Sequence, residues 1–370
     1  MENQSRYLSL DVLRGMTVTL MIVVNTPGNY STTFGPLLHA HWHGFTPTDW
    51  VFPTFLFVVG NAMSFALPKY ESLGDSAFLK KVFKRTFLIF LIGYLSYWFP
   101  FVHPTPEGGW AFNPFSDTRV FGVLQRIALC YGIASLVLHY WKEKGALIVS
   151  GVFLFGYWLV MSIFGDLTLE GNAGLRLDKF LLGDSHLYHG EGVAFDPEGL
   201  LSTFPAVVNT FIGYFAGRFI QQHKNQFEVI ARMMIAGALL MFAAYWWDLV
   251  FPINKKLWTS SFVLYTTGID LLALSILIYF IDVLQKKKWT YFFEVFGKNT
   301  LFIYLLSEVG VILLWFIQPG GSPLFSSAFQ RVFQPVFGDY MGSFLFAVSW
   351  MLICWAVGYW MDKRKIYIKI

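Results

Sequence analysis

Charged side chains are scarce in this 370-residue chain, where Asp, Glu, Lys and Arg make up 14% of the residues. A soluble domain carries about a quarter. Apolar residues make up 55%, with 40 Phe and 14 Trp, and the mean hydropathy is +0.52. The shortage of charge therefore indicates an integral membrane protein. Because lipid offers the backbone no hydrogen bonds, its spanning elements must be helices or a closed barrel.

Cysteine is almost absent. Cys130 and Cys354 are the two, and both lie inside apolar runs, which argues against a disulfide framework or a thiolate metal site. A long basic tract is missing, so the net charge of +4 does not point to a nucleic-acid partner. A cleavable signal peptide is not evident either, because Asp11 and Arg14 interrupt the first apolar run. Without repeats or a soluble segment, residues 1–370 are expected to form a single integral-membrane domain.

Apolar runs of about twenty residues recur along the chain without strict alternation, which favours membrane-spanning helices over barrel strands. The ten predicted spans are 8–25, 48–67, 84–102, 119–140, 145–164, 198–220, 232–250, 259–284, 294–317 and 341–361. With the N-terminus inside, the inner segments hold 19 Lys and Arg and the outer segments hold six. This bias predicts an all-α polytopic transmembrane bundle of about ten helices with both termini cytoplasmic.

The predicted outer loops differ from the short, basic inner ones. Residues 26–47, 103–118, 165–197 and 318–340 are long and rich in Gly, Pro, His and aromatic residues. They form either a cap over an external cavity or solvated connections, and both readings stay open. Helix faces rich in Phe and Gly pack either within one chain or against a second copy, so a homodimer is also left open.

Three histidines, His39, His41 and His43, lie between the first two apolar runs. Histidine is the side chain best suited to proton transfer near neutral pH, and His39 is the predicted catalytic residue. The alternating spacing also fits a metal site, but no Cys or second His pair accompanies it, so we expect no metal. Asn25 ends the first run. Either it terminates the helix before the following turn, or its side-chain amide holds a substrate carbonyl. Asp49 begins the second, either as a favourable helix-terminal acid or as the partner of the His39 ring.

Further polar residues lie in or near the spans. Asp11 and Arg14 pair with each other or bind a phosphate at the inner face. Arg126, next to Gln125, needs a partner, for which Asp11, Glu198, Asp248 and Asp270 are the candidates. Glu198 suits a helix N-terminus. The outer segment FPINKKLWTSS has two readings: its residues bind an anion or a sugar, or its lysines form a hydrated turn and its Trp an interface anchor. The residues concerned are Asn254, Lys255, Lys256 and Trp258.

At these residues the chain resembles the heparan-alpha-glucosaminide N-acetyltransferase family, including its bacterial members. The similar segments are SLDVLRGM, the VN–PG turn, HAHWHGFTPTDWVFPTFLFVVG, GVLQRIAL, FDPEGLLSTFPA, FPINKKLWTSSFVL and GKNTLFIY. The resemblance implies a multi-pass enzyme of the bacterial inner membrane that moves an acetyl group from cytoplasmic acetyl-CoA to a glucosamine-type amine on the outer side. It places the family's catalytic histidine at His39 and its asparagine at Asn25.

We divide the candidate residues into three predicted sets. Catalysis is assigned to His39, Asn25 and Asp49; acetyl-CoA binding to Arg14, Asp11, Gln125 and Arg126; and acceptor binding to His43, Trp42, Glu198, Asn254, Lys255 and Trp258. His39 acts as a general base or accepts the acetyl group itself. Two alternatives are an O-acyltransferase of envelope polysaccharide and a transporter of sugars or small anions.

The predicted topology is tested by cysteine accessibility. Single cysteines at Lys286, Lys287 and Lys288 should react with a membrane-impermeant thiol reagent only after the cytoplasmic face is opened, because these lysines belong to an inner loop. Labelling of these positions in intact cells would overturn the topology.

Overall fold

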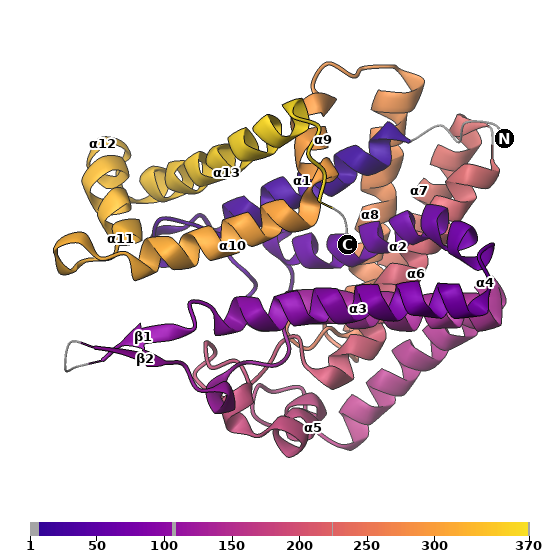
Figure 1. The fold of residues 1–370 in the computed structure, drawn as a ribbon. Coiled ribbons are helices and arrows are strands. Elements are labelled where there is room, and N and C mark those ends of the chain that lie inside the picture. Colours follow the sequence, from indigo (N-terminus) through magenta and orange to yellow (C-terminus); the bar gives the residue numbers. More distant parts are fainter. Residues whose placement is uncertain (1–6, 106–108, 224, 369–370) are drawn as a thin grey trace. The chain divides into compact units, whose positions relative to one another are not determined.

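A computed structural model describes residues 7–105, 109–223 and 225–368, and most of these residues are helical (Figure 1). Their one sheet is a hairpin in which β1 (Val102–Pro104) pairs antiparallel with β2 (Trp110–Phe112). Within this described part, seven helices are long and apolar enough to cross a membrane, and a bent pair would be an eighth. The predicted all-α polytopic membrane protein is confirmed.

The described residues form two compact units. Unit 1 contains those within 1–40, 46–51 and 277–369, and unit 2 contains those within 41–45 and 52–276. Helix α2 (Pro47–Glu71) begins in unit 1 and continues in unit 2. The expectation of one membrane domain over the whole chain stays a prediction.

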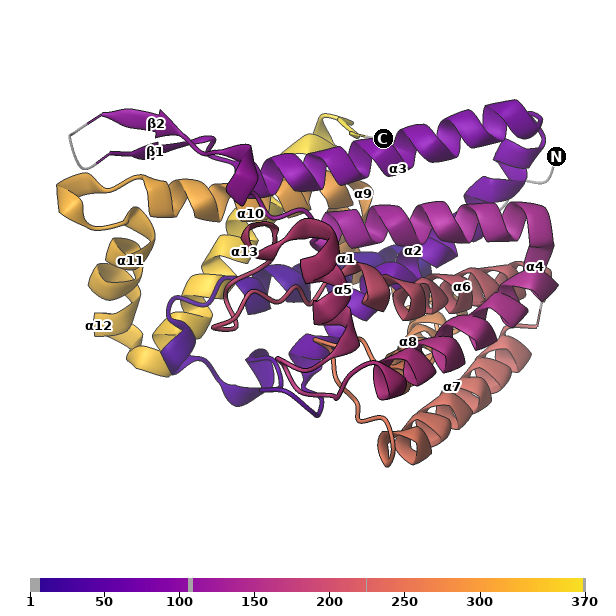
Figure 2. The same cartoon turned by 90° about the horizontal axis from the view of Figure 1, so that it is seen from below.

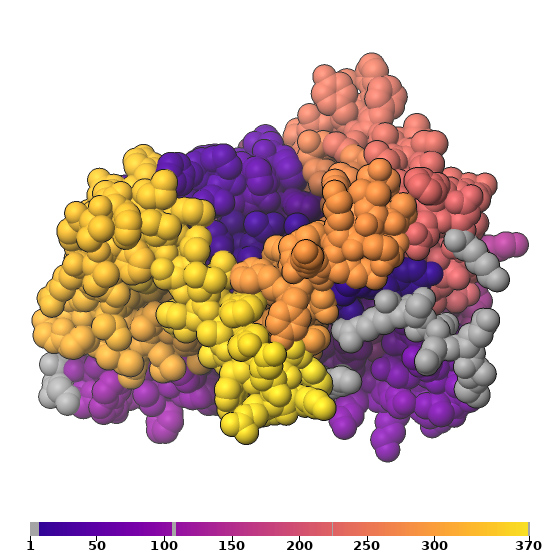
Figure 3. Space-filling model, turned by 90° about the horizontal axis from the view of Figure 1, so that it is seen from above, coloured from indigo at the N-terminus to yellow at the C-terminus, as the bar shows by residue number. Residues whose placement is uncertain are grey.

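Unit 1 is built on α1, which packs against α9, α10 and α13. Its other elements are short turns of helix and two π-helical segments, η5 and η7. The bounds are α1 (Leu8–Asn25), η1 (Tyr30–Thr32), η2 (Gly35–Leu37), η5 (Ile278–Val283), α9 (Thr290–Lys298), α10 (Thr300–Phe316), η6 (Pro319–Gly321), α11 (Leu324–Ala328), η7 (Phe329–Phe333), α12 (Gln334–Phe337) and α13 (Asp339–Lys363). α10 also packs against α13. In the space-filling view, the yellow surface of the C-terminal residues lies beside the orange surface of the residues that precede them (Figure 3).

The predicted span 294–317 is broken in the structure. α9 and α10 meet at 83° on either side of Asn299. The Asn299 side chain donates to the carbonyl of Ile366 and accepts from the amide of Ile368, at 2.9 Å each. Asparagine competes with helical hydrogen bonding through its side chain, and here that side chain binds the C-terminal segment. The prediction of one continuous helix was wrong at this point.

Unit 2 contains most of the longer helices. Their bounds, with two short turns, are α3 (Asp75–Trp98), η3 (Phe115–Asp117), α4 (Val123–Ile163), α5 (Ala173–Leu182), η4 (Asp184–His186), α6 (Leu200–Gln222), α7 (Gln226–Asp248) and α8 (Ser260–Leu277), which continues into η5. α4 turns back on itself at Lys142, whose φ of 54° interrupts the helix (Figure 2). Its two halves correspond to the predicted spans 119–140 and 145–164.

The other predicted spans coincide with helices, with shifted ends. α3 ends at Trp98 instead of residue 102, and α4 begins at Val123 instead of 119. Arg126 therefore lies in the first turn of its helix and not a third of the way along a span. The total of ten spans and the cytoplasmic placement of both termini stay predictions.

Two glycines allow α2 and α6 to cross closely inside unit 2. A Cβ added at Gly60 would lie 1.9 Å from the carbonyl oxygen of Thr210, and one added at Gly213 would lie 1.9 Å from that of Phe57. Small residues that let backbones approach are the usual packing device of membrane helices. The close crossing thus depends on the absence of side chains at Gly60 and Gly213.

Large apolar side chains cover the outward faces of several helices. On α7 the side chains of Phe242, Tyr245 and Trp246 are each more than half exposed, and on α4 so are those of Phe155 and Leu159. Surfaces of this kind on a soluble protein would mark a binding interface. On helices of bilayer length they are the faces that lipid covers.

The α2–α6 crossing can be tested by adding one methyl group. Gly60→Ala should lower the free energy of unfolding by about 1–3 kcal/mol, because the new Cβ meets backbone that cannot move aside cheaply. Gly156→Ala in α4 is the matched control, since nothing lies within 4 Å of its added Cβ. Thermal unfolding in detergent measures both variants, and equal melting temperatures would contradict this account of the crossing.

Candidate active site

The strongest candidate site in unit 1 is an ion pair between a histidine and a buried carboxylate. His39 Nδ1 lies 2.7 Å from Asp49 Oδ1. The Asp49 side chain is 1% exposed, whereas that of His39 is 40% exposed. With its proton on Nδ1 directed at the carboxylate, the neutral ring has Nε2 as its basic nitrogen. A base oriented by a buried acid is the arrangement used for proton transfer in acyl-transfer enzymes.

Asp49 is fixed by the start of α2. Its Oδ2 accepts from the amide of Thr46 at 2.9 Å, the hydroxyl of Thr46 at 3.1 Å and the amide of Ala40 at 3.1 Å. The single proton of the Thr46 hydroxyl is shared between this oxygen and the carbonyl oxygen of Leu38, which lies 2.6 Å away. The helix therefore begins with one of the two hydrogen bonds of a capping box, from the Thr46 amide to Asp49, and with proline at its first position. The same carboxylate caps the helix and holds the histidine.

Asn25 is the last residue of α1 and is exposed. Its Nδ2 lies 3.5 Å from Glu308 Oε1 on α10, at the limit of a hydrogen bond. Its carbonyl accepts from the Tyr30 hydroxyl at 3.0 Å. Asn25, Glu308, His39 and Asp49 all belong to unit 1, and the amide donor of Asn25 has the chemistry needed to stabilise an oxyanion.

Asp11 and Arg14, the predicted phosphate anchor, pair with each other. Arg14 Nη1 lies 3.2 Å from Asp11 Oδ1 and 3.5 Å from the carbonyl oxygen of Gly297. Asp11 is buried, and the Arg14 side chain is 24% exposed. This geometry fits the (i, i+3) pair that the sequence offered as one of two readings, and the phosphate role stays a prediction.

Arg126 lies fully buried in unit 2. Among the described residues, its guanidinium forms hydrogen bonds with a carbonyl and a hydroxyl but not with a carboxylate. Its Nη2 donates to the carbonyl of Gly199 at 3.1 Å and to the hydroxyl of Ser202, and the group lies 4.8 Å from the centre of the Trp258 ring. Within the described chain, its Nε and Nη1 have no hydrogen-bond partner, nor does either polar atom of buried Gln125. Unpartnered buried donors suggest a water or a ligand here.

Glu198, one of the four candidate partners of Arg126, is bound by another arginine. Arg119 forms two hydrogen bonds with Asp196, at 2.9 and 2.7 Å, and one with Glu198 at 2.6 Å. Its guanidinium also lies 4.7 Å from the ring centres of Tyr97 and Tyr188. Burial raises the pKa of Glu198, but the neighbouring cations outweigh this and hold that pKa below its usual range.

Two of the residues predicted to bind the acceptor are buried in the segment that precedes α8. Asn254 accepts from the amide of Leu257 at 2.8 Å, and its Nδ2 lies 3.3 Å from His43 Nδ1. Trp258 is completely buried and donates to Asn209 Oδ1 at 3.1 Å. Both therefore shape this turn, and their role toward an acceptor stays a prediction.

Trp42 and His43 are more accessible. The Trp42 indole donates to the carbonyl of Leu167 at 2.8 Å. The surface of His43 is largely exposed. The part of its ring that is removed from water lowers its pKa, and the negative charge of Asp248 partly offsets this by raising it. Nearby, Lys256 forms an ion pair with Glu191 at 2.6 Å and donates to the carbonyl of His41. Lys256 thus has anchoring contacts, and both it and its neighbour Lys255 are half-buried.

The structure brings the catalytic candidates His39 and Asp49 into direct contact, and brings Glu198 together with Arg119. It adds Thr46 and Arg119, which sequence reasoning had not assigned to the site, and it gives contacts to Lys256, which the sequence had offered for an anion or a sugar. Thr46 had a detectable signal, because T-P-T-D is a capping-box spacing. The partners of Arg119 and Lys256 lie 77 and 65 residues away, so local patterns could not reveal them. Among the described residues, no group of three or more His, Cys, Asp or Glu could hold a metal ion.

Comparison with known proteins agrees with these observations. The family model described as "Heparan-alpha-glucosaminide N-acetyltransferase, catalytic" matches residues 6–247. Relatives named heparan-alpha-glucosaminide N-acetyltransferase from Mus musculus and Homo sapiens are each 28% identical over 82% of this chain. The match covers 54% and 53% of those two proteins, so the chain spans about half the length of these curated relatives.

Asp178 on α5 generates a pH-dependent prediction. It is buried and accepts from the amide of Leu200 at 3.0 Å at the start of α6, and burial raises its pKa to about 7. An unfolded Asp titrates near pH ~4, so the folded protein binds the extra proton between about pH 4 and 7. Stability from this group is therefore full below pH ~4 and is lost as the pH rises toward 7.

Asp178→Asn removes this titration while retaining an oxygen for the Leu200 amide. The melting temperature of the original protein relative to the variant should fall between pH 5 and about 7.5, because only the original carboxyl ionises. Thermal unfolding in detergent at several pH values measures the difference. A difference independent of pH would contradict the raised pKa.

Proposed function

Because this chain belongs to the heparan-alpha-glucosaminide N-acetyltransferase family, we propose that it transfers the acetyl group of acetyl-CoA to the amine of a glucosamine-type sugar. It works as a multi-pass enzyme of the bacterial inner membrane, with acetyl-CoA entering from the cytoplasm and the acceptor on the outer side. The observation that carries the chemistry is the contact between exposed His39 and buried Asp49.

His39 acts as the base toward the acceptor. An ammonium group is not nucleophilic, so the sugar amine must react in its neutral form. As the neutral nitrogen bonds to the thioester carbonyl it becomes positively charged and must lose one proton. Nε2 takes that proton, and Asp49 keeps Nδ1 protonated and stabilises the cationic ring. The thioester C–S bond then breaks, the cationic ring returns its proton to the sulfur, CoA leaves as the thiol, and the amide is formed.

Asn25 supports the same step through its amide. The attack places negative charge on the former carbonyl oxygen, and an N–H directed at that oxygen lowers the barrier. The contact between Asn25 and Glu308 is long, at 3.5 Å, so its exchange for an oxyanion costs little. Glu308 then positions the amide before the substrate arrives.

The donor is proposed to reach this site along the membrane normal. Its phosphates meet basic groups near the inner face, such as Arg14 or the cluster from Lys80 to Arg85, and its thioester reaches the outer half near Asn25. Gln125 and Arg126 of unit 2 are also proposed to bind acetyl-CoA, because the amide of Gln125 and the Nε and Nη1 of Arg126 are buried without partners among the described residues and suit the amides of a pantetheine arm.

Substitution of the pair tests the proposal. His39→Ala should lower kcat roughly 10²–10⁴-fold, the usual contribution of a general base. Asp49→Asn should lower kcat by a similar order, because an amide leaves the ring proton on the wrong nitrogen. His189→Ala, which changes an exposed histidine of another predicted outer loop, is the control. Near-normal turnover by the His39 variant would refute the assignment.

Two readouts define the reaction further. Product mass spectrometry with amino sugars and neutral sugars distinguishes amine from hydroxyl acceptors, and release of CoA distinguishes an enzyme from a transporter. Incubation with labelled acetyl-CoA alone separates the two routes. Label retained on the original protein and lost from His39→Ala indicates an acetyl-imidazole intermediate, whereas no retained label indicates direct transfer.

A further inference from the structure

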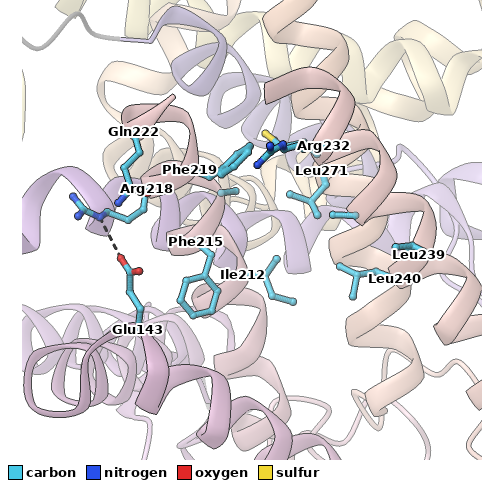
Figure 4. A pocket seen from close by; sticks show the side chains of 13 residues that line it. Glu143, Ile212, Phe215, Arg218, Phe219, Gln222, Arg232, Leu239, Leu240 and Leu271 are labelled. Carbon is cyan, nitrogen blue, oxygen red and sulfur yellow. Dashed lines mark hydrogen bonds and ion pairs between the residues drawn. The ribbon is translucent and has the colours of Figure 1, made fainter. Parts of the chain in front are cut away.

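Unit 2 contains a cavity of about 660 Å³ between α6, α7 and α8 (Figure 4). Its volume falls within the ~300–1,000 Å³ typical of small-molecule sites. Most of its lining is apolar and comes from Ile212, Phe215, Ala216, Phe219, Met233, Ala236, Leu239, Leu240 and Leu271. None of its residues belongs to the candidate active site.

The polar part of the lining lies toward one end of the two helices. Arg218 and Gln222 are in the last turns of α6, and Arg232 is near the start of α7, so all three lie close to the connection between these helices. Ile212 and Leu240 lie farther along. From Arg232 to Leu240 the helix rises about 12 Å at 1.5 Å per residue. The cavity therefore has a polar end and an apolar body.

The polar end contains charges of both signs, and cations outnumber carboxylates only among the residues that line the cavity. The lining contains two guanidinium groups, Arg218 and Arg232, and one carboxylate, Glu143. Arg218 pairs with Glu143 through Nε at 3.4 Å, and Arg232 pairs with Glu228 at 2.7 Å within α7. Both pairs are substantially exposed, and exposed pairs contribute about 0–1 kcal/mol. Their guanidinium groups can therefore turn toward a phosphate at small cost.

The cavity is accessible from the membrane. α7 has mostly exposed side chains, and Leu239, which lines the cavity, is 62% exposed. The positive-inside bias places Arg218 and Arg232 on the cytoplasmic side. Anionic lipids of that leaflet are attracted to basic residues near the surface. The cavity thus combines an apolar slot open to lipid with cations at the level of the headgroups.

We propose that this cavity binds an anionic phospholipid, with its phosphate between Arg218 and Arg232 and an acyl chain along the α6–α7 slot. The apolar lining is complementary to the chain, and the two guanidinium groups are complementary to the phosphate. The site is independent of the acetyl-transfer proposal, because it shares no residue with it.

The test is native mass spectrometry of the purified full chain in mixed micelles with equal phosphatidylglycerol and phosphatidylcholine. The original protein should retain phosphatidylglycerol preferentially. The double substitution Arg218→Gln with Arg232→Gln should reduce that preference roughly tenfold or more, at about 1 kcal/mol for each cation. Lys144→Gln, which changes an exposed cation outside the lining, should leave it unchanged.

A second pair of variants tests the apolar slot. Ala236→Trp fills the cavity from α7 and should reduce retention of both lipids, whereas Ala238→Trp, on an exposed position outside the lining, should not. Equal retention of the two lipids by the original protein would overturn the proposal, since the site would then hold bulk lipid only. Competition by inorganic phosphate or acetyl-CoA at millimolar concentration would also overturn it, because the ligand would then be a soluble phosphate.

Discussion

A fully buried carboxylate must obtain its hydrogen bonds from the protein, and the candidate site depends on how Asp49 does so. Its two oxygens contact Thr46, Ala40 and the ring of His39. These contacts begin α2, close the loop after η2 and set the orientation of the histidine. Loss of the carboxylate would leave several donors unpaired at once, each at about 1–3 kcal/mol. One side chain therefore couples helix capping to the chemistry.

The same requirement explains the polar residues of unit 2. Arg119 satisfies Asp196 and Glu198 between two tyrosine rings, and all its partners come from distant parts of the chain. Arg126 is only partly satisfied. Burying an unpaired cation costs free energy. The fully paired cluster around Arg119 therefore has the features of a structural ion-pair network, whereas the surroundings of Arg126 have those of a site that binds a further partner.

Glycine and asparagine set the paths of several helices. Gly60 and Gly213 allow two backbones to approach, and Asn299 ends α9 by binding residues near the C-terminus. The positions of all three are plain in the sequence, but their consequences are not. A glycine in an apolar run can lie either at a close helix crossing or on a face that contacts lipid. Gly156 is not at a close crossing, since nothing lies within 4 Å of its added Cβ.

The sequence by itself determined the helical membrane class and the approximate helix positions, and it offered the pairing of Asp49 with His39 as one of two readings. These depend on local quantities: apolar run length, loop charge, and a carboxylate ten residues from a histidine across one short loop. Only the tertiary structure decided the bend at Asn299, the pairing of Arg119 instead of Arg126 with Glu198, and the burial of Asn254 and Trp258. The physical reason is that burial and pairing are set by residues tens to hundreds of positions away, and no local pattern specifies which of several possible partners will be nearest.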